Sequence, residues 1–369
     1  MAKRRVTGLL LAFFSLTVGV LAAEEPRFNW NLDDIKVNWF AVPTGPIFKF
    51  GFGPLALMPG LHSAFEGKFG AGYENIAVSR SDRSGDPLPL GAPGMSAIDK
   101  PDAQWELGFR QGLVPLDEKR DLISVWSSLH GRFEMNPWAG IVSIYPDRNT
   151  AFIHSLLAGA TLDDSRRSVH GQLSGTVLGL EGEWGPSFLS LEGTDFWRLK
   201  AEATEYLPLF DLPTERNMLS GSLVLRANAK YIEGRQVPIF MLEGTDVRAY
   251  PQKLDTKIRA YAAVEPRLNL PSIIGKSDLL PTLFVFCDSG YYRGYNDLPA
   301  NSAWVDSASG RESSGFLLSA GGGLELDAFQ LAQLVVSAGI PILDADSLGI
   351  PNSNQNAFWW SVDLSMHIK

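Results

Sequence analysis

The stretch Leu219 to Ile232 reads LSGSLVLRANAKYI and alternates between two kinds of side chain. From position 223 to position 229 the odd-numbered positions carry leucine or alanine, whereas positions 226, 228 and 230 carry arginine, asparagine and lysine. Successive side chains of a strand point to opposite faces, so this pattern predicts a strand with one apolar and one polar face. An apolar face toward lipid and a polar face toward a water-filled interior are typical of a transmembrane β-barrel.

Segments with strand character recur on both sides of this stretch. We expect strands at 105–114, 121–135, 151–162, 169–184, 188–206, 257–270, 283–293, 315–328, 331–343 and 357–368. Segment 151–162 is also compatible with a helix by composition, and context favours a strand. Segment 81–101 is rich in Pro, Gly, Ser and Asp, which predicts a long loop. The last strand places apolar residues on one face and polar residues on the other, although it ends on Lys369 where such barrels commonly end on an aromatic residue.

Composition and length predict one all-β domain over residues 24–369. The chain has 36 glycines and 11% aromatic residues, both high for a soluble domain, and no linker divides it. We predict a transmembrane antiparallel β-barrel of about 16 strands, with any count from about 12 to 16 compatible with the length, because such barrels have even strand counts and strands of about 10 residues. A soluble β-sandwich is the alternative.

Residues 1–23 are predicted to be a secretory signal peptide. Lys3, Arg4 and Arg5 precede a largely apolar run, and small residues at Ala22 and Ala23 then precede a polar segment. An uncleaved membrane anchor is the alternative, but the run is shorter than the roughly 20 residues of a membrane helix. No cysteine lies near the cleavage zone, so we expect a protein without a lipid anchor.

Charge and residue types argue against several functions. Without the three basic residues of residues 1–23, the 32 basic and 41 acidic residues become 29 and 41, which disfavours nucleic-acid binding. The single cysteine, Cys287, excludes an intrachain disulfide and a multi-cysteine zinc site. No nucleophile-elbow pattern surrounds a serine and no histidine pair has metal-ligand spacing. We therefore expect no enzyme activity, no metal and no cofactor.

Two motifs at a distance of about forty residues point to a loop inside the barrel. The segment Phe240 to Tyr250 ends in Val247-Arg248-Ala249-Tyr250, and a later strand reads Phe286-Cys287-Asp288-Ser289-Gly290. A loop that enters a lumen loses entropy and needs anchors. An arginine offers a planar fork of donors that matches a carboxylate, so we expect Arg248 to bind Asp288, with Glu265 as a second partner.

From about Leu219 to Lys369 the order of these motifs resembles the barrel of the surface-antigen superfamily, which includes BamA-like and TamA-like assembly factors and two-partner secretion transporters. In that family a long loop enters the lumen with a Val-Arg-Gly-Tyr/Phe tip, the next strand carries an acidic residue, and the strand after it carries Phe-x-Asp-x-Gly. The resemblance implies a loop tip at Val247, Arg248, Ala249 and Tyr250, a latch of Arg248 with Asp288 and Glu265, and a strand motif with Phe286 and Gly290.

Three departures from the family pattern limit what the resemblance implies. Ala249 stands where the family has glycine, which would be strained if the position needs a positive φ. Pro266 follows Glu265, which argues against a regular mid-strand position for that carboxylate. The chain also has no room for the periplasmic POTRA modules of the assembly and secretion members, so we expect a barrel alone.

The sequence thus favours a barrel of the cell outer membrane that takes part in outer-membrane assembly or in lipid or polypeptide transport. Its expected partners are the lipids of the outer membrane and client proteins of the periplasm or outer membrane, with no nucleic acid; the oligomeric state stays open. The alternative is a diffusion porin or a structural surface antigen without insertase activity.

Overall fold

The structure is a computed structural model that describes most of the chain. No helix in the described part is long and apolar enough to cross a membrane. The described residues are 27–38, 47–55, 61–77, 97–117, 120–134, 151–167, 173–189, 195–214, 218–235, 246–250, 256–275, 278–294, 314–329, 332–343 and 358–368. The predicted signal peptide, residues 1–23, lies outside these ranges.

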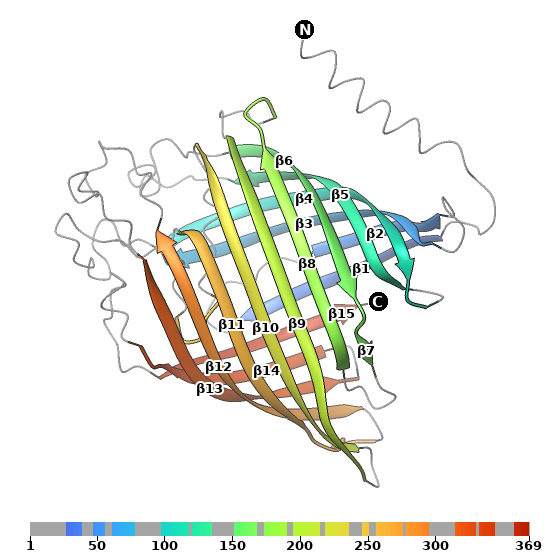
Figure 1. Ribbon diagram of the computed structural model, residues 1–369, viewed down its shortest axis with the longest axis vertical. Coiled ribbons are helices and arrows are strands. Elements are labelled where there is room, and N and C mark those ends of the chain that lie inside the picture. Colours follow the sequence, from blue (N-terminus) through green and yellow to red (C-terminus); the bar gives the residue numbers. More distant parts are fainter. Residues whose placement is uncertain are drawn as a thin grey trace, which may run out of the picture.

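The described residues form one antiparallel sheet of fifteen strands (Figure 1). The strands are β1 (Arg27–Asn38), β2 (Ile47–Leu55), β3 (Ser63–Ala77), β4 (Ala97–Pro115), β5 (Asp121–Glu134), β6 (Ala151–Asp163), β7 (Arg166–Arg167), β8 (Leu173–Gly185), β9 (Asp195–Pro213), β10 (Met218–Arg235), β11 (Thr256–Asn269), β12 (Leu279–Gly294), β13 (Ser314–Ala328), β14 (Ala332–Pro341) and β15 (Trp359–Ile368).

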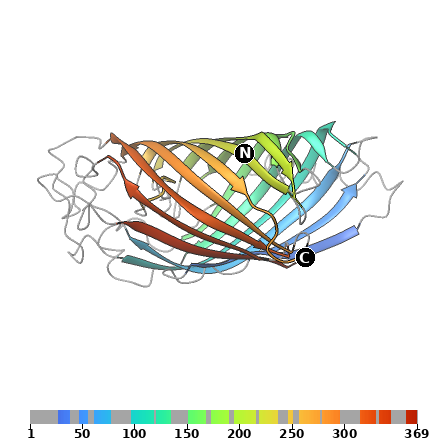
Figure 2. The ribbon, with the colours of Figure 1, turned by 90° about the horizontal axis from the view of Figure 1, so that it is seen from below.

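The order of pairing makes the sheet a barrel. Apart from the two-residue β7, consecutive strands pair antiparallel along the chain; in addition β6 pairs with β8 and β1 pairs with β15. The ladder therefore returns to its start through fourteen strands, since the fifteenth, β7, pairs only with β8. Figures 1 and 2 show these tilted strands wrapping around a common interior. Closure leaves no free sheet edge along most of the wall, which a membrane-spanning sheet requires.

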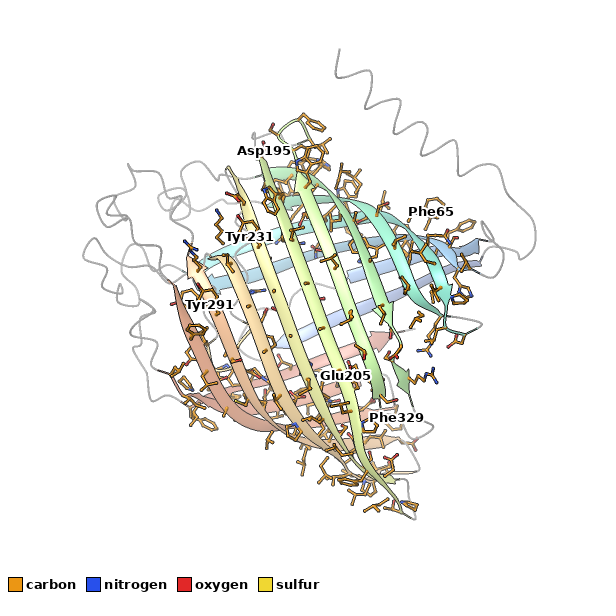
Figure 3. All side chains as sticks on the ribbon, in the orientation of Figure 1. Phe65, Asp195, Glu205, Tyr231, Tyr291 and Phe329 are labelled. Atoms are coloured by element: carbon orange, nitrogen blue, oxygen red, sulfur yellow. The ribbon has the colours of Figure 1, made fainter. Side chains whose placement is uncertain are left out.

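Side chains alternate between an apolar outer face and a polar inner face. On β12, Leu283, Val285 and Cys287 are exposed, whereas Phe284, Phe286 and Asp288 between them are buried. The outer face carries many large exposed apolar residues around the wall (Figure 3). The buried polar residues include many serines and several charged residues, among them Glu183, Lys230, Arg259 and Glu265. This polarity is the reverse of a soluble protein and matches a barrel with lipid outside.

Glycines let two aromatic rings lie flat against the inner wall. On β13, an added Cβ at Gly321 would collide with the Phe286 ring, and one at Gly323 would collide with the Phe284 ring. The glycines of this run thus allow a close approach within a strand. The rings come from β12, the strand that also carries Asp288.

Several predicted boundaries differ from the structure. Segment 151–162 is a strand, β6, as context predicted. The predicted loop 81–101 is wrong at its end, because β4 begins at Ala97 and its first residues pair with the end of β3. The strand predicted at 188–206 is β9, which runs from Asp195 to Pro213, because the chain turns at 186–189 and then pairs with the whole length of β10. Fourteen of the fifteen strands form the ring, a number within the predicted range of 12 to 16.

A charge on the outer face of β12 tests this orientation. Val285 is 57% exposed near the middle of the strand, so Val285→Lys would place an ammonium group in the lipid core. We expect it to lower the free energy of unfolding in lipid bilayers by about 2–4 kcal/mol, and Tyr291→Lys, on the same face and close to the end of β12, to have a smaller effect. Chemical denaturation in vesicles measures both. Equal, negligible effects would contradict a lipid-facing outer surface.

Candidate functional site

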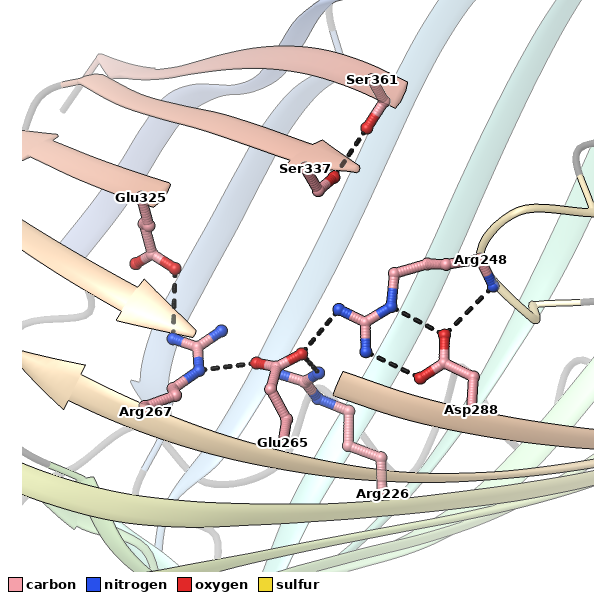
Figure 4. Close-up of polar contacts among 8 residues, drawn as sticks. All are labelled: Arg226, Arg248, Glu265, Arg267, Asp288, Glu325, Ser337 and Ser361. Atoms are coloured by element: carbon pink, nitrogen blue, oxygen red, sulfur yellow. Dashed lines mark hydrogen bonds and ion pairs between the residues drawn. The ribbon is translucent and has the colours of Figure 1, made fainter. Parts of the chain in front are cut away.

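Residues 246–250, which we call the inward loop, lie against the inner face of the barrel between β10 and β11. Val247 and Tyr250 are buried and pack with Tyr292 and Leu317 from β12 and β13, with Tyr261 beside them. The preceding part of the predicted loop, residues 240–245, lies outside the described residues. The close-up in Figure 4 shows the inward loop approaching the wall with Arg248 directed at β11 and β12.

Arg248 and Asp288 form a two-pronged ion pair. The Arg248 Nε and Nη2 atoms donate to the two carboxylate oxygens of Asp288, each at 2.7 Å. The backbone N–H of Arg248 donates to the same carboxylate at 3.1 Å. The Asp288 side chain has no exposure to solvent, and that of Arg248 is 20% exposed. Planar guanidinium and carboxylate groups in this arrangement fix orientation as well as distance.

Glu265 accepts hydrogen bonds from three arginines. Its Oε2 atom lies 2.7 Å from Nη1 of Arg248 and 3.2 Å from Nη1 of Arg226, and its Oε1 atom lies 2.7 Å from Nε of Arg267. Arg267 also donates to Glu325 at 3.1 Å. Figure 4 shows the resulting chain of alternating charges along the inner wall. Three carboxylates and three arginines balance, so the network carries no net charge.

The strand position of Glu265 explains why Pro266 is tolerated. Glu265 faces inward from β11, opposite Val224 of β10, and Pro266 faces outward opposite Leu223. On the other side of β11, the pairing with β12 stops after Val264 and resumes at Arg267, so it skips Glu265 and Pro266. A proline lacks the N–H that a central strand position would use. The expectation that Pro266 moves Glu265 out of a regular strand is wrong, because β10 pairs through both residues.

An aromatic ring also contacts the guanidinium group of Arg248. The guanidinium carbon of Arg248 lies 3.6 Å from the centroid of the Phe286 ring, so the cation stacks on its face. Gly290, the other residue of the strand motif, lies where an added Cβ would come within 2.6 Å of Val247 Cγ2. The spacing of Phe286, Asp288 and Gly290 thus puts a stacking ring, a carboxylate and a gap on one face of β12.

The charge of Arg248 is secured by its surroundings. Burial opposes the charged form, but the hydrogen bonds and charge of Asp288, followed by the charge of Glu265, raise the pKa of Arg248 above its ordinary value. The guanidinium therefore stays charged over the whole pH range in which a protein is folded. Arg248 is an anchor and has no role in proton transfer.

The inward loop has a further anchor that we did not predict from the sequence. The Asp246 carboxylate accepts a hydrogen bond from Asn228 Nδ2 at 3.1 Å and pairs with Arg259 Nη2 at 2.9 Å. Asn228 and Arg259 face inward from β10 and β11. The alternation of β10 indicates the inward side of Asn228, but the partner depends on the register of two strands with the loop, which no local pattern reveals.

Two residues of the inward loop have a left-handed backbone. Asp246 has φ 60° and Ala249 has φ 71°. Aspartate tolerates this region because its short polar side chain bonds locally, but alanine has no such compensation. Ala249, which stands where the resembling family has glycine, therefore holds a strained conformation that the anchors on either side impose.

A second polar cluster lies on the inner face of β5, β6, β8 and β9. Ser155 Oγ donates to Glu183 Oε1 at 2.5 Å, and His130 Nδ1 lies 3.6 Å from the same oxygen. Arg198 Nη2 lies 2.8 Å from Glu183 and 2.7 Å from Glu181. Among the described residues no group of three or more His, Cys, Asp or Glu side chains could hold a metal ion. The cluster ties four neighbouring strands together.

Comparison with known proteins identifies the type of fold. No protein-family model and no curated protein sequence matches the chain. A crystal structure of BamA from Haemophilus ducreyi lacking POTRA domains 1–3 is similar with a TM-score of 0.51 and 12% identity, over 94% of this chain and 71% of that one. CdiB from Acinetobacter baumannii is similar with a TM-score of 0.41 and 13% identity, over 94% and 61%. The chain has the fold of a BamA-like outer-membrane barrel.

A double-mutant cycle tests the anchor between Arg248 and Asp288. Arg248→Ala leaves the buried Asp288 without a counter-charge, so we expect it to cost roughly 3–5 kcal/mol. Asp288→Ala should cost less, because Arg248 keeps Glu265 as a partner. The double variant should cost far less than the sum, because neither charge remains. Unfolding in detergent, followed by the heat-modifiable mobility of the folded barrel, measures the three variants. Additive effects would show that the two residues act independently.

Ala249→Gly tests the strain in the inward loop. Glycine populates positive φ freely, and relief of the left-handed alanine is worth roughly 1–2 kcal/mol, partly offset by the greater freedom of glycine in the unfolded chain. We expect a small net stabilisation. The control is Ala262→Gly on the outer face of β11, where glycine should destabilise by about 0.5–1 kcal/mol. The same sign for both substitutions would contradict the strain.

Proposed function

We propose that this chain is a barrel of the cell outer membrane whose interior is plugged by the inward loop, and that it handles lipid or polypeptide at that membrane. The observation that carries the proposal is the set of contacts that binds the Arg248 side chain. Its side chain is held by Asp288 at two points and by Glu265 at a third, on the inner wall of a BamA-type barrel. These hydrogen bonds hold the loop inside the lumen, which favours a plugged barrel over an open pore.

The polarity of the wall supports this location. The outer face is apolar around the barrel, and the inner face carries ion-pair networks on two sides. The connections between strands are short at the end that holds the last strand's C-terminus and long at the other, as in barrels of the outer membrane. A loop held by polar contacts can leave the lumen and return, which suits a barrel that opens for a client and then closes.

A diffusion pore is the second candidate. In such a pore the acidic balance of the chain would lean towards cation preference, because an excess of carboxylates attracts cations to an open lumen. The two candidates differ in the state of the intact protein. A pore conducts ions steadily, whereas a plugged barrel conducts only when the inward loop moves.

Planar-bilayer conductance separates them. We expect the intact protein to give small, flickering channels, and Arg248→Ala to give larger and longer openings, because the loop loses its main anchor. The control is Lys68→Gln, which removes a charge from β3 that pairs with Glu106 on another part of the wall; it should conduct like the intact protein. Large, stable channels in the intact protein would overturn the plugged barrel in favour of the pore.

The same bilayers test whether the plug responds to a client. An unfolded outer-membrane polypeptide, or lipid-loaded vesicles, would be added on the side of the short turns. An increase in open time with one of them and not the other assigns the client class. No response to either, together with a plugged lumen, would contradict transport or assembly and leave a structural role.

A further inference from the structure

Tyr250 attaches the inward loop to a part of the barrel that neither Arg248 nor Asp288 reaches. Its hydroxyl lies 2.6 Å from the carbonyl oxygen of Leu343 and 3.1 Å from that of Leu318. Leu318 belongs to β13, whereas Leu343 lies two residues beyond the end of β14. The single hydroxyl proton is therefore shared between a strand and the chain that leaves the next strand.

The chain leaving β14 is already folded back onto the same carbonyl. The backbone N–H groups of Ile342 and Leu343 point at Leu318 O, at 2.7 and 3.4 Å. The ladder between β13 and β14 reaches Pro341, which pairs with Ser319 but has no N–H to donate. The amides after the proline thus complete the ladder, and the Tyr250 hydroxyl holds the segment from the inside.

The contacts of the inward loop extend over five consecutive strands. Asp246 bonds to side chains of β10 and β11, Arg248 to side chains of β11 and β12, and Tyr250 to β13 and to the exit of β14. The five residues of the inward loop thus connect neighbouring strands on the inner face of the wall. Figure 4 shows Arg248 of the loop beside Glu265 of β11 and Asp288 of β12.

We propose that the inward loop is a brace that holds the curvature of β10 to β14, and that Tyr250 is the positioning residue that secures the exit of β14. Wall side chains do not fill the interior of a barrel with this many strands, so contacts from a loop can add support to the wall. Within β10 to β14 the least paired strand is β14, which pairs with β13 at ten positions and with β15 at eight, compared with fifteen positions between β12 and β13.

Hydrogen exchange measured on the full chain tests the brace. Tyr250→Phe removes one hydroxyl and keeps the ring in its apolar cluster. We expect the amides of Ile342 and Leu343 to exchange between about twofold and about tenfold faster, the range that loss of one hydrogen bond allows. Amides of β4 and β5, on a distant part of the wall, should exchange as before.

The matched control is Tyr292→Phe. Tyr292 belongs to the same buried cluster and is 3% exposed, but its hydroxyl has no hydrogen-bond partner among the described residues. Its removal should leave the exchange of residues 342 and 343 unchanged. Arg248→Ala, which frees the inward loop by another route, should accelerate the same two amides.

Two results would overturn the proposal. Equal exchange at residues 342 and 343 in Tyr250→Phe and Tyr292→Phe would show that the hydroxyl secures nothing. Acceleration spread evenly over β4, β5 and the β14 exit would show a general loss of stability. If Tyr250→Phe fails to give the folded, heat-modifiable form, the Arg248→Ala pattern decides between the same outcomes. Hydrogen exchange is measured without a client and without ion conduction. The test of the brace is therefore independent of the test of the proposed function.

Discussion

Asp288, a carboxylate on the inner wall of this barrel, is shielded from solvent, and within the part of the chain that the structure describes a single residue of opposite charge contacts it. The three donors that contact Asp288 all come from Arg248, one of them from its backbone. A buried charge in this position is tolerable only while its partner is present. The wall and the inward loop therefore depend on each other, because β12 carries a charge that Arg248 of the loop neutralises.

The neighbouring carboxylate shows the opposite arrangement. Glu265 keeps Arg226 and Arg267 as partners in addition to Arg248. Departure of the loop would leave Glu265 with two cations and Asp288 with none. The cost of displacing the loop is therefore concentrated at Asp288, and Glu265 serves as a fixed receptor to which Arg248 can return. This asymmetry gives a plug a defined resting place without making it permanent.

Much of the wall and the central ion pair could be predicted from the sequence, because both leave a local trace. Alternation marks β10 to β15 directly, and Arg248 and Asp288 lie in short motifs with a recognisable spacing. The role of Asp246 could not be predicted, since its partners Asn228 and Arg259 are brought to it by the register of β10 and β11. The extent of β9 was misjudged for a related reason: its last residues pair with β10 across an irregularity at Gly221 and Ser222 that shifts the alternation.

The place of the inward loop in the chain has a consequence for biogenesis. The loop precedes every group that receives its arginine and tyrosine: Glu265 on β11, Asp288 on β12, Leu318 on β13 and Leu343 after β14. Once those strands have closed with β15 and β1, the interior is walled on that side. The receiving groups all follow the loop in the chain, so its contacts cannot be complete before β14 has taken its place in the wall.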